Sequence, residues 1–193
     1  MGILNNQSHT NGPLQGKRIA ILATEGFEEV ELTKPKQALE EAGASVDVIA
    51  PESGIKLGEI KGWDKTDWGK KVNVDVKLAD AKPGDYDALH LPGGAMNPDH
   101  LRQLPAAVEF AKSFFTANKP VSAICHASWT LIESGSVKGK TMTSWPSLRT
   151  DLLNAGAHWV DKEVAVDGKF VTSRKPEDIP AFNKQIVETF AAG

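Results

Sequence analysis

The alternation of strand-like and helix-like segments constrains the fold of this chain more than any other feature. From Lys17 onward, short runs of aliphatic and β-branched residues are followed by longer segments with helical spacing. Such alternation builds a mainly parallel sheet covered by helices. We predict strands over 18–23, 45–50, 86–91 and 121–124, a hairpin within 163–173, and helices over 29–41, 106–117, 126–134, 147–154 and 177–191.

The length of 193 residues suits one domain with a full hydrophobic core. We expect residues 1–16 to be a flexible N-terminal leader and residues 17–193 to be a single domain. The leader lacks the basic start and the apolar stretch of a secretory signal peptide, and no run approaches the roughly 20 apolar residues that span a bilayer. We therefore expect a cytoplasmic protein without a membrane partner.

Charge and cysteine content exclude further classes of function. The net charge is -3, and the sequence has no cluster of Lys and Arg, which argues against a nucleic-acid partner. A single cysteine excludes an internal disulfide and leaves no set of thiolates for a structural zinc site. Neither a G-x-G-x-x-G motif nor a Walker loop is present, so we expect no cofactor and no metal.

The single cysteine, Cys125, directly follows the strand predicted over 121–124 and precedes a helical segment. A side chain at such a turn lies at the carboxyl end of the sheet, where open α/β folds bind ligands. The N-terminus of the following helix would lower the pKa of the thiol and favour the reactive thiolate. A buried cysteine that only packs is the commoner case, so the pattern alone leaves both interpretations open.

Two further motifs follow other predicted strands. Gly93-Gly94 comes after the strand ending at Leu91, and consecutive glycines can expose backbone N–H donors to a bound group, although most such pairs are simple turns. The acidic segment EGFEE, residues 25–29, follows the first strand. Acids at a helix start usually interact only with the helix dipole, so no single one of these glutamates is assigned a role by position.

Taken in order, the motifs EGFEEVEL (25–32), LPGGAMNPDHLR (91–102), AICHA (123–127), TSWPSLRTDLLNAGAHWVD (143–161) and VTSRKPEDIPAF (171–182) resemble the ThiJ/PfpI family of the class I glutamine amidotransferase-like superfamily. The likeness covers nearly everything from Lys17 onward and is stronger to the PfpI-type intracellular protease and deglycase branch than to the small Parkinsonism-associated members. It implies a flavodoxin-like three-layer α/β/α sandwich with a nucleophile elbow at Cys125.

The resemblance also implies roles for individual residues. The family's nucleophile falls on Cys125, and its buried, protonated carboxyl, which donates a hydrogen bond to the thiolate, falls on Glu28. His126 matches the histidine that follows the nucleophile. Asp99 matches an acid that reaches this histidine from a neighbouring subunit, which implies a homo-oligomer, either a dimer or a hexamer. The backbone N–H groups of Gly94 and His126 are the candidates for an oxyanion hole.

Two segments depart from the family pattern. Many members have Gly-Pro after the Cys-His pair, whereas this chain has Ala127-Ser128 and then Trp129, so we expect Gly93 and Trp129 to shape the pocket. Residues 61–71 form an expected loop that carries Trp63 and Trp68. Packing within the chain and contact with another subunit are equally good explanations of this aromatic pair, and stacking on a substrate is a less favoured one.

Several functions share such a cysteine site. The favoured one is a stress-response enzyme that acts on reactive carbonyls or glycated adducts, of the glyoxalase III or protein deglycase type. The alternatives are a PfpI-type intracellular cysteine peptidase, acting on a peptide or protein, and a redox sensor that oxidises Cys125 without turnover. Glutamine amidotransfer is disfavoured because the late region offers only His158 and no His-x-Glu.

Overall fold

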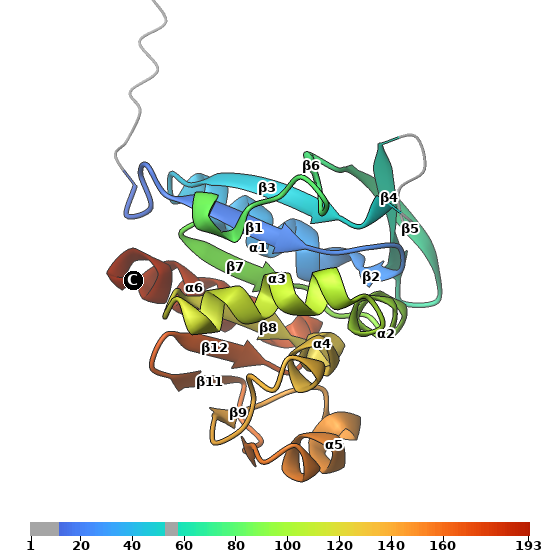
Figure 1. The fold of residues 1–193 in the computed structure, drawn as a ribbon, viewed down its shortest axis with the longest axis vertical. Coiled ribbons are helices and arrows are strands. Elements are labelled where there is room, and N and C mark those ends of the chain that lie inside the picture. The colour runs from blue at the N-terminus through green and yellow to red at the C-terminus, as the bar shows by residue number, and fades with distance from the viewer. Residues whose placement is uncertain (1–11, 53–57) are drawn as a thin grey trace, which may run out of the picture.

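The computed structural model describes residues 12–52 and 58–193, and its largest sheet has seven strands in the order β11-β12-β8-β7-β1-β3-β6 (Figure 1). All neighbours in it are parallel except β11 and β12, which form the expected hairpin. The strands are β1 (Arg18–Leu22), β3 (Ser45–Ala50), β6 (Val76–Lys77), β7 (Ala88–Leu91), β8 (Val121–Ile124), β11 (Val164–Asp167) and β12 (Phe170–Ser173).

Helices cover both faces of this sheet, so the predicted three-layer α/β/α sandwich is confirmed. Figure 1 shows α3 in front of the sheet and α1 behind it. One core joins α3 and α4 to the front face through Phe110, Phe114 and Leu131, and the other joins α1 and α6 to the back face through Leu32 and Phe182. The helices are α1 (Glu29–Glu41), α2 (Met96–Arg102), α3 (Pro105–Thr116), α4 (Ser128–Glu133), α5 (Arg149–Asn154) and α6 (Ile179–Ala192).

The segment expected as a loop over 61–71 is a β-hairpin instead. Strand β4 (Glu59–Asp64) pairs antiparallel with β5 (Asp67–Asn73), and β2 (Phe27–Glu28) joins β4 in a second sheet. Trp63 and Trp68 face each other across the hairpin with their ring centroids 5.6 Å apart in an edge-to-face arrangement. The loop prediction was wrong because the polar residues of this segment occupy a solvent-facing ribbon, in which cross-strand aromatic pairs support the register.

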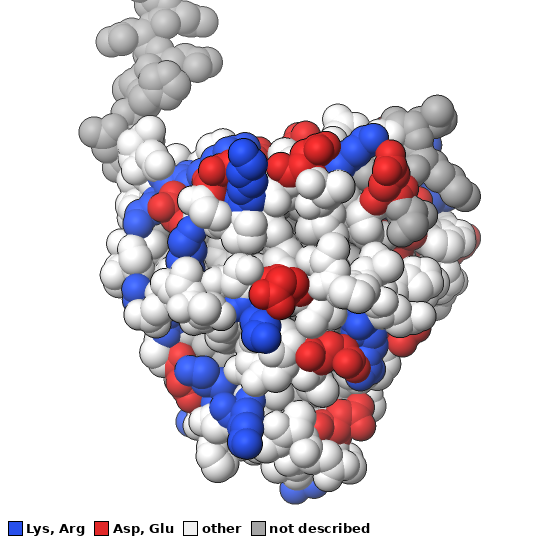
Figure 2. Space-filling view, viewed as in Figure 1, with Lys and Arg blue, Asp and Glu red and all other residues white. Residues whose placement is uncertain are grey.

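Most of the expected leader, residues 1–11, lies outside the described residues. The remainder, residues 12–16, packs against the domain: Leu14 is fully buried, and its N–H donates to the carbonyl of Ala42 over 2.9 Å. The domain therefore begins before Lys17. No helix among the described residues is long and apolar enough to cross a bilayer. On the face drawn in Figure 2, basic and acidic side chains are interspersed.

His90 lies in the middle of the sheet, on β7, and is fully buried. Its Nδ1 is 2.9 Å from the Ser122 hydroxyl and its Nε2 is 2.8 Å from the carbonyl oxygen of Glu31. Burial lowers the pKa of His90 to about 4, so the ring is neutral at neutral pH. Because the carbonyl can only accept, Nε2 carries the proton, and Nδ1 accepts from Ser122.

Acid should therefore destabilise the fold through His90. The unfolded state binds a proton near pH 6.5 and the folded state only near pH 4, so stability falls as the pH drops through this window, by about 3 kcal/mol in total. Urea unfolding at pH 7, 6, 5 and 4 measures this loss. His90→Gln removes the titrating group and should flatten the profile by a similar amount, whereas equal slopes in both proteins would contradict the assignment.

Candidate active site

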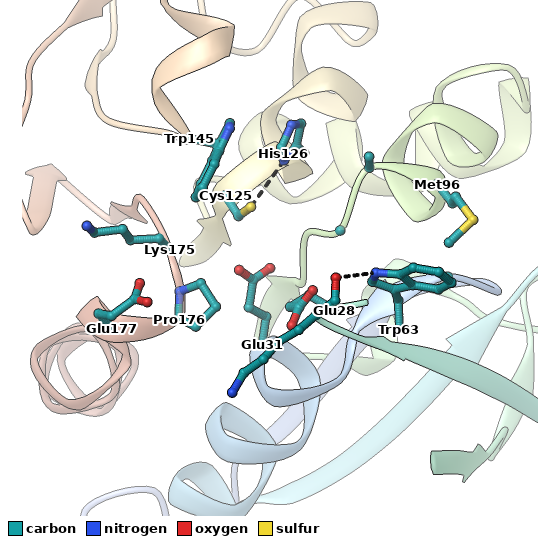
Figure 3. A pocket seen from close by; sticks show the side chains of 14 residues that line it. Glu28, Glu31, Trp63, Met96, Cys125, His126, Trp145, Lys175, Pro176 and Glu177 are labelled. Atoms are coloured by element: carbon teal, nitrogen blue, oxygen red, sulfur yellow. Dashed lines mark hydrogen bonds between the residues drawn. The ribbon is translucent and has the colours of Figure 1, made fainter. Parts of the chain in front are cut away.

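The carboxyl ends of β1, β7 and β8 meet at one edge of the sheet, and a pocket of about 560 Å³ opens there (Figure 3). The chain runs from β1 to β3 on one side and later returns to β7 on the other side of β1. This reversal of strand order leaves a crevice between the connecting segments, as in other open α/β sheets. Cys125 and His126 line the pocket, together with residues from the β4–β5 hairpin and from the segments after β9 and β12.

Cys125 follows β8 directly and is the first residue of a short 3₁₀ turn that leads into α4. Its φ is +62°, a left-handed conformation that is strained for a residue with a side chain. The Trp145 N–H donates to the Cys125 carbonyl over 3.1 Å and helps to hold this turn. The side chain is only 6% exposed and is the one free thiol of the chain. The geometry is that of a nucleophile elbow.

The backbone N–H groups of Gly94 and His126 point at the Cys125 sulfur. Both were predicted from the sequence as oxyanion-hole donors, and the structure brings both to the reacting atom. Gly94 has a φ of +78°, and a Cβ there would lie 2.5 Å from the Gly26 carbonyl oxygen and 2.7 Å from the Glu28 nitrogen. Only glycine fits this close approach of two backbone segments.

The buried carboxyl beside the cysteine belongs to Glu31, not to Glu28 as we predicted. Glu31 is fully buried, and its Oε2 accepts the Gly93 N–H over 2.9 Å. Its Oε1 is also buried and has no hydrogen-bond partner among the described residues. Figure 3 shows this carboxyl pointing toward the Cys125 sulfur. A protonated Glu31 can therefore donate through Oε1 to the sulfur.

Glu28 lies at the end of β2, before the first turn of α1, and is only half-buried. Its carboxylate accepts the backbone N–H of Lys65 at the tip of the hairpin. Partial burial raises the pKa of Glu28 despite this bond. Both glutamates line the pocket, but Glu28 is partly exposed, whereas Glu31, three residues later, is fully buried. The prediction missed this difference because it took the glutamate next to Phe27 without applying the helical period of the following residues.

Glu31 and Cys125 form a coupled pair of ionisable groups. Burial raises the pKa of Glu31 to about 8, and the neighbouring charge of Glu28 adds to the rise. Burial raises the pKa of the Cys125 thiol, and a charge on Glu31 raises it further, whereas the N–H groups of Gly94 and His126 lower it. Burial outweighs these donors, so the pKa of Cys125 is raised, contrary to the lowering that we expected from the helix N-terminus. Two buried groups in contact resist carrying two negative charges, so Glu31 and Cys125 together keep at least one proton near neutral pH.

His126 lies beside the nucleophile, as predicted, with Nδ1 3.1 Å from the Cys125 sulfur (Figure 3). Burial lowers the pKa of His126, so the ring is neutral near pH 7 and can accept a proton. The ring of Trp145 stacks on it at a centroid distance of 5.8 Å, and Trp129 packs edge-on at 5.1 Å. The two indoles fix the plane of the imidazole.

The structure corrects the expected positions of two pocket residues. Trp129 does not line the cavity: it lies behind His126, where its Nε1 donates to Asp151 over 3.1 Å. Trp145, which the sequence reasoning did not single out, forms that part of the wall. Gly93 lies beneath the pocket, and a Cβ there would be 2.5 Å from Glu31 Oε2 and 2.7 Å from the Cys125 Cβ. Its role is close packing under the site.

Asp99 is not part of the pocket of its own chain. It lies exposed in the first turn of α2, and Pro98 before it is buried. The expectation that it reaches the His126 of a neighbouring subunit stays a prediction. Among residues 12–52 and 58–193, no three His, Cys, Asp or Glu side chains gather as a possible metal site.

Three further residues line the pocket mouth without having been assigned to it. Trp63 projects from β4, and Lys65 from the hairpin turn, where its φ is +58°. The Trp63 Nε1 donates to the Lys65 carbonyl over 2.9 Å, which ties the indole to this turn. Lys175, half-buried after β12, completes the mouth on the other side (Figure 3). Only the aromatic pair of the hairpin gave a signal in the sequence, and substrate contact was the least favoured interpretation of it.

The reactivity of Cys125 should depend on Glu31 and not on Glu28. A hydrogen bond to a charged group contributes about 1.5–3 kcal/mol, so Glu31→Ala should slow alkylation of the thiol by iodoacetamide at pH 7 by roughly 10- to 100-fold. Glu31→Gln keeps an N–H donor and should retain most of the rate. Glu28→Gln is the matched control and should stay within about twofold of wild type; a larger effect at Glu28 than at Glu31 would reverse the assignment.

Gly94→Ala should displace the N–H donor from the sulfur, because the added Cβ meets backbone atoms that cannot move aside. We expect the alkylation rate at pH 7 to fall about tenfold or more, together with a lower Tm. Gly84→Ala is the control, since a Cβ at Gly84 has no atom within 4 Å. Equal rates in the two variants would show that the Gly94 N–H does not stabilise the thiolate.

Comparison with known proteins identifies the family of this chain. A model of the DJ-1/PfpI family matches residues 17–189. The Bacillus subtilis protein named "Putative cysteine protease YraA" is 46% identical over 169 residues, which are 88% of this chain and 95% of that protein. A Staphylococcus epidermidis protein, uncharacterized protein SERP1413, is 44% identical over 91% of this chain and 99% of its own length.

Solved structures of DJ-1 and DJ-1/ThiJ/PfpI-like proteins have a similar fold. The crystal structure of Drosophila melanogaster DJ-1beta superposes with a TM-score of 0.80 at 28% identity, covering 92% of this chain and 91% of that one. A two-domain protein from Anabaena variabilis with DJ-1/ThiJ/PfpI-like and ferritin-like domains superposes with a TM-score of 0.82 at 32% identity, over 89% of this chain and 47% of that chain. The fold, the family model and the relatives together show that this chain belongs to the DJ-1/PfpI family.

Proposed function

We propose that this protein is a cysteine-dependent enzyme that acts on small reactive carbonyl compounds, or on their adducts with protein side chains. The observation that carries the proposal is the set of groups around one sulfur: a strained Cys125, a buried Glu31 carboxyl beside it, and two backbone N–H donors aimed at it. The N–H groups favour a thiolate against the effect of burial and, after attack, can stabilise an oxyanion.

The shape of the pocket supports a small substrate. Trp145 stands beside the sulfur, and Trp63 lies across the cavity from it (Figure 3). A volume of about 560 Å³ holds a small molecule or one modified side chain. An extended peptide needs a groove with several subsites, and the hairpin that carries Trp63 and Lys65 limits the pocket on that side.

Methylglyoxal, an aldehyde next to a ketone, illustrates the chemistry. The Cys125 sulfur bonds to the aldehyde carbon, and the resulting alkoxide takes a proton from Glu31, which gives a hemithioacetal. His126 removes the hydrogen from that carbon as a proton and returns it at the ketone carbon, while the hydroxyl proton of the hemithioacetal moves to the ketone oxygen, which gives a thioester. Water then hydrolyses the thioester to lactate and the Cys125 thiolate, and of the two protons set free one returns to Glu31 and the other goes to solvent. One carbon is oxidised and its neighbour is reduced, so the reaction needs water and no external oxidant.

A test compares wild type, Cys125→Ser and Glu31→Gln with methylglyoxal after anaerobic reduction, with lactate measured as the product. Wild type should form lactate, and Cys125→Ser should lose at least about 1000-fold because the nucleophile is gone. Glu31→Gln should keep a reactive thiol yet turn over about 100-fold more slowly, since an amide cannot deliver the proton. Lactate formation by Cys125→Ser at the wild-type rate would refute the proposal.

Peptide hydrolysis is the second candidate, because a relative at 46% identity carries the name of a cysteine protease. In this case the Cys125 thiolate attacks an amide, and His126 protonates the leaving amine. The same three proteins should be incubated with unstructured fluorescent casein. Casein cleavage that depends on Cys125, without lactate formation, would show that the protein is a peptidase and not an enzyme of carbonyl compounds. No detectable activity in either assay would favour a redox sensor based on Cys125 oxidation.

A further inference from the structure

Glu31 has an unusual backbone environment at the start of α1. A helical carbonyl normally accepts the N–H of the residue four positions later. That residue is Pro35, which lies inside the helix and has no N–H to donate. Glu31 and Pro35 are both buried, so water cannot easily replace the missing donor. A buried carbonyl without a donor costs free energy and leaves the first helical turn poorly fixed.

His90 supplies the missing donor. Its Nε2 lies 2.8 Å from the Glu31 carbonyl oxygen, and the ring is fully buried. Ser122 orients the ring from the other side, with its hydroxyl 2.9 Å from Nδ1. His90 and Ser122 are direct partners in the β7–β8 register, so the sheet itself sets this contact. The ring of Phe182 packs against the imidazole at 5.8 Å.

These contacts connect the elements that build the site. The strand with His90 leads into Gly93, whose N–H holds the Glu31 carboxyl. The strand with Ser122 ends one residue before Cys125. Glu31 is therefore held at its backbone by His90 and at its carboxyl by Gly93, both from one short segment of chain.

We propose that His90 is a positioning residue: by binding the Glu31 carbonyl that Pro35 leaves without a donor, it fixes the first turn of α1 so that the Glu31 carboxyl stands against the Cys125 sulfur. His90 touches neither the pocket nor the sulfur and acts only through Glu31. This inference rests on the role that the proposed function gives to Glu31.

The test uses a matched pair of neutral amides at position 90. His90→Gln places an N–H₂ group where Nε2 stood and can still donate to the Glu31 carbonyl. His90→Asn is one methylene shorter and reaches Ser122 but not the carbonyl. Because the chain has a single cysteine, iodoacetamide reports on Cys125 alone. We expect about tenfold slower alkylation at pH 7 for His90→Asn, with the midpoint of the pH profile moved upward, and a rate within threefold of wild type for His90→Gln.

Two controls separate positioning from general stability. Phe182→Leu weakens the packing on the same ring without removing a hydrogen bond, so it should lower the Tm and leave the alkylation profile unchanged. If His90→Asn does not fold, Ser122→Ala takes its place and should slow alkylation about threefold by freeing the ring. If His90→Asn, or Ser122→Ala where His90→Asn does not fold, is alkylated at the wild-type rate, the inference is overturned.

Glu31→Ala separates a failure of the positioning role of His90 from a failure of the role that the proposed function gives to Glu31. If it slows alkylation and His90→Asn does not, the positioning role is wrong and the proposed function stands. If Glu31→Ala leaves the profile unchanged, the role of Glu31 fails, and the role of His90 fails with it. The inference is supported only when Glu31→Ala and His90→Asn both slow alkylation and His90→Gln restores the rate.

Discussion

The burial of one carboxyl group against one thiol sets the conditions for the rest of this structure. Glu31 is fully excluded from solvent and Cys125 is nearly so. Removing an acid from water is costly unless it is neutral or well paired, and here one oxygen has a single backbone donor while the other faces sulfur. Backbone N–H groups from Gly93 and Gly94 offset part of this cost. To reach the buried carboxyl and thiol, these two residues pack so closely against neighbouring atoms that only glycine fits.

Much of the scaffold could be predicted from the sequence, because its strands and helices follow simple periods. The strand over 45–50 and the helix over 29–41 have the predicted bounds, and the nucleophile elbow lies where the strand-to-helix change at Cys125 places it. The hairpin of β4 and β5 was missed. In β4 only Ile60 and Gly62 are buried, and β5 has no buried residue, so the alternation of apolar and polar residues was too short to mark a strand pair.

The site was only partly predictable, and its main error has a clear physical origin. Glu28 and Glu31 both belong to the motif EGFEEVEL, residues 25–32, and the motif alone did not separate them. Helical periodicity does: Glu31 lies four residues before Pro35 and eight before Leu39, on the buried stripe of α1. Trp145 had no comparable signal, because its place beside His126 depends on a turn between elements that are distant in the sequence.

Main-chain groups surround the reactive sulfur of the pocket, whereas side chains form much of its walls. The groups aimed at the sulfur from Gly94 and His126 are main-chain N–H groups, which a side-chain substitution does not delete. The walls, by contrast, are side chains carried by an exposed hairpin and by connecting segments, among them Trp63 and Lys175. Substitutions there can reshape what enters while the thiol chemistry below is preserved. The fold thus allows substrate preference to evolve separately from the reactivity of its nucleophile.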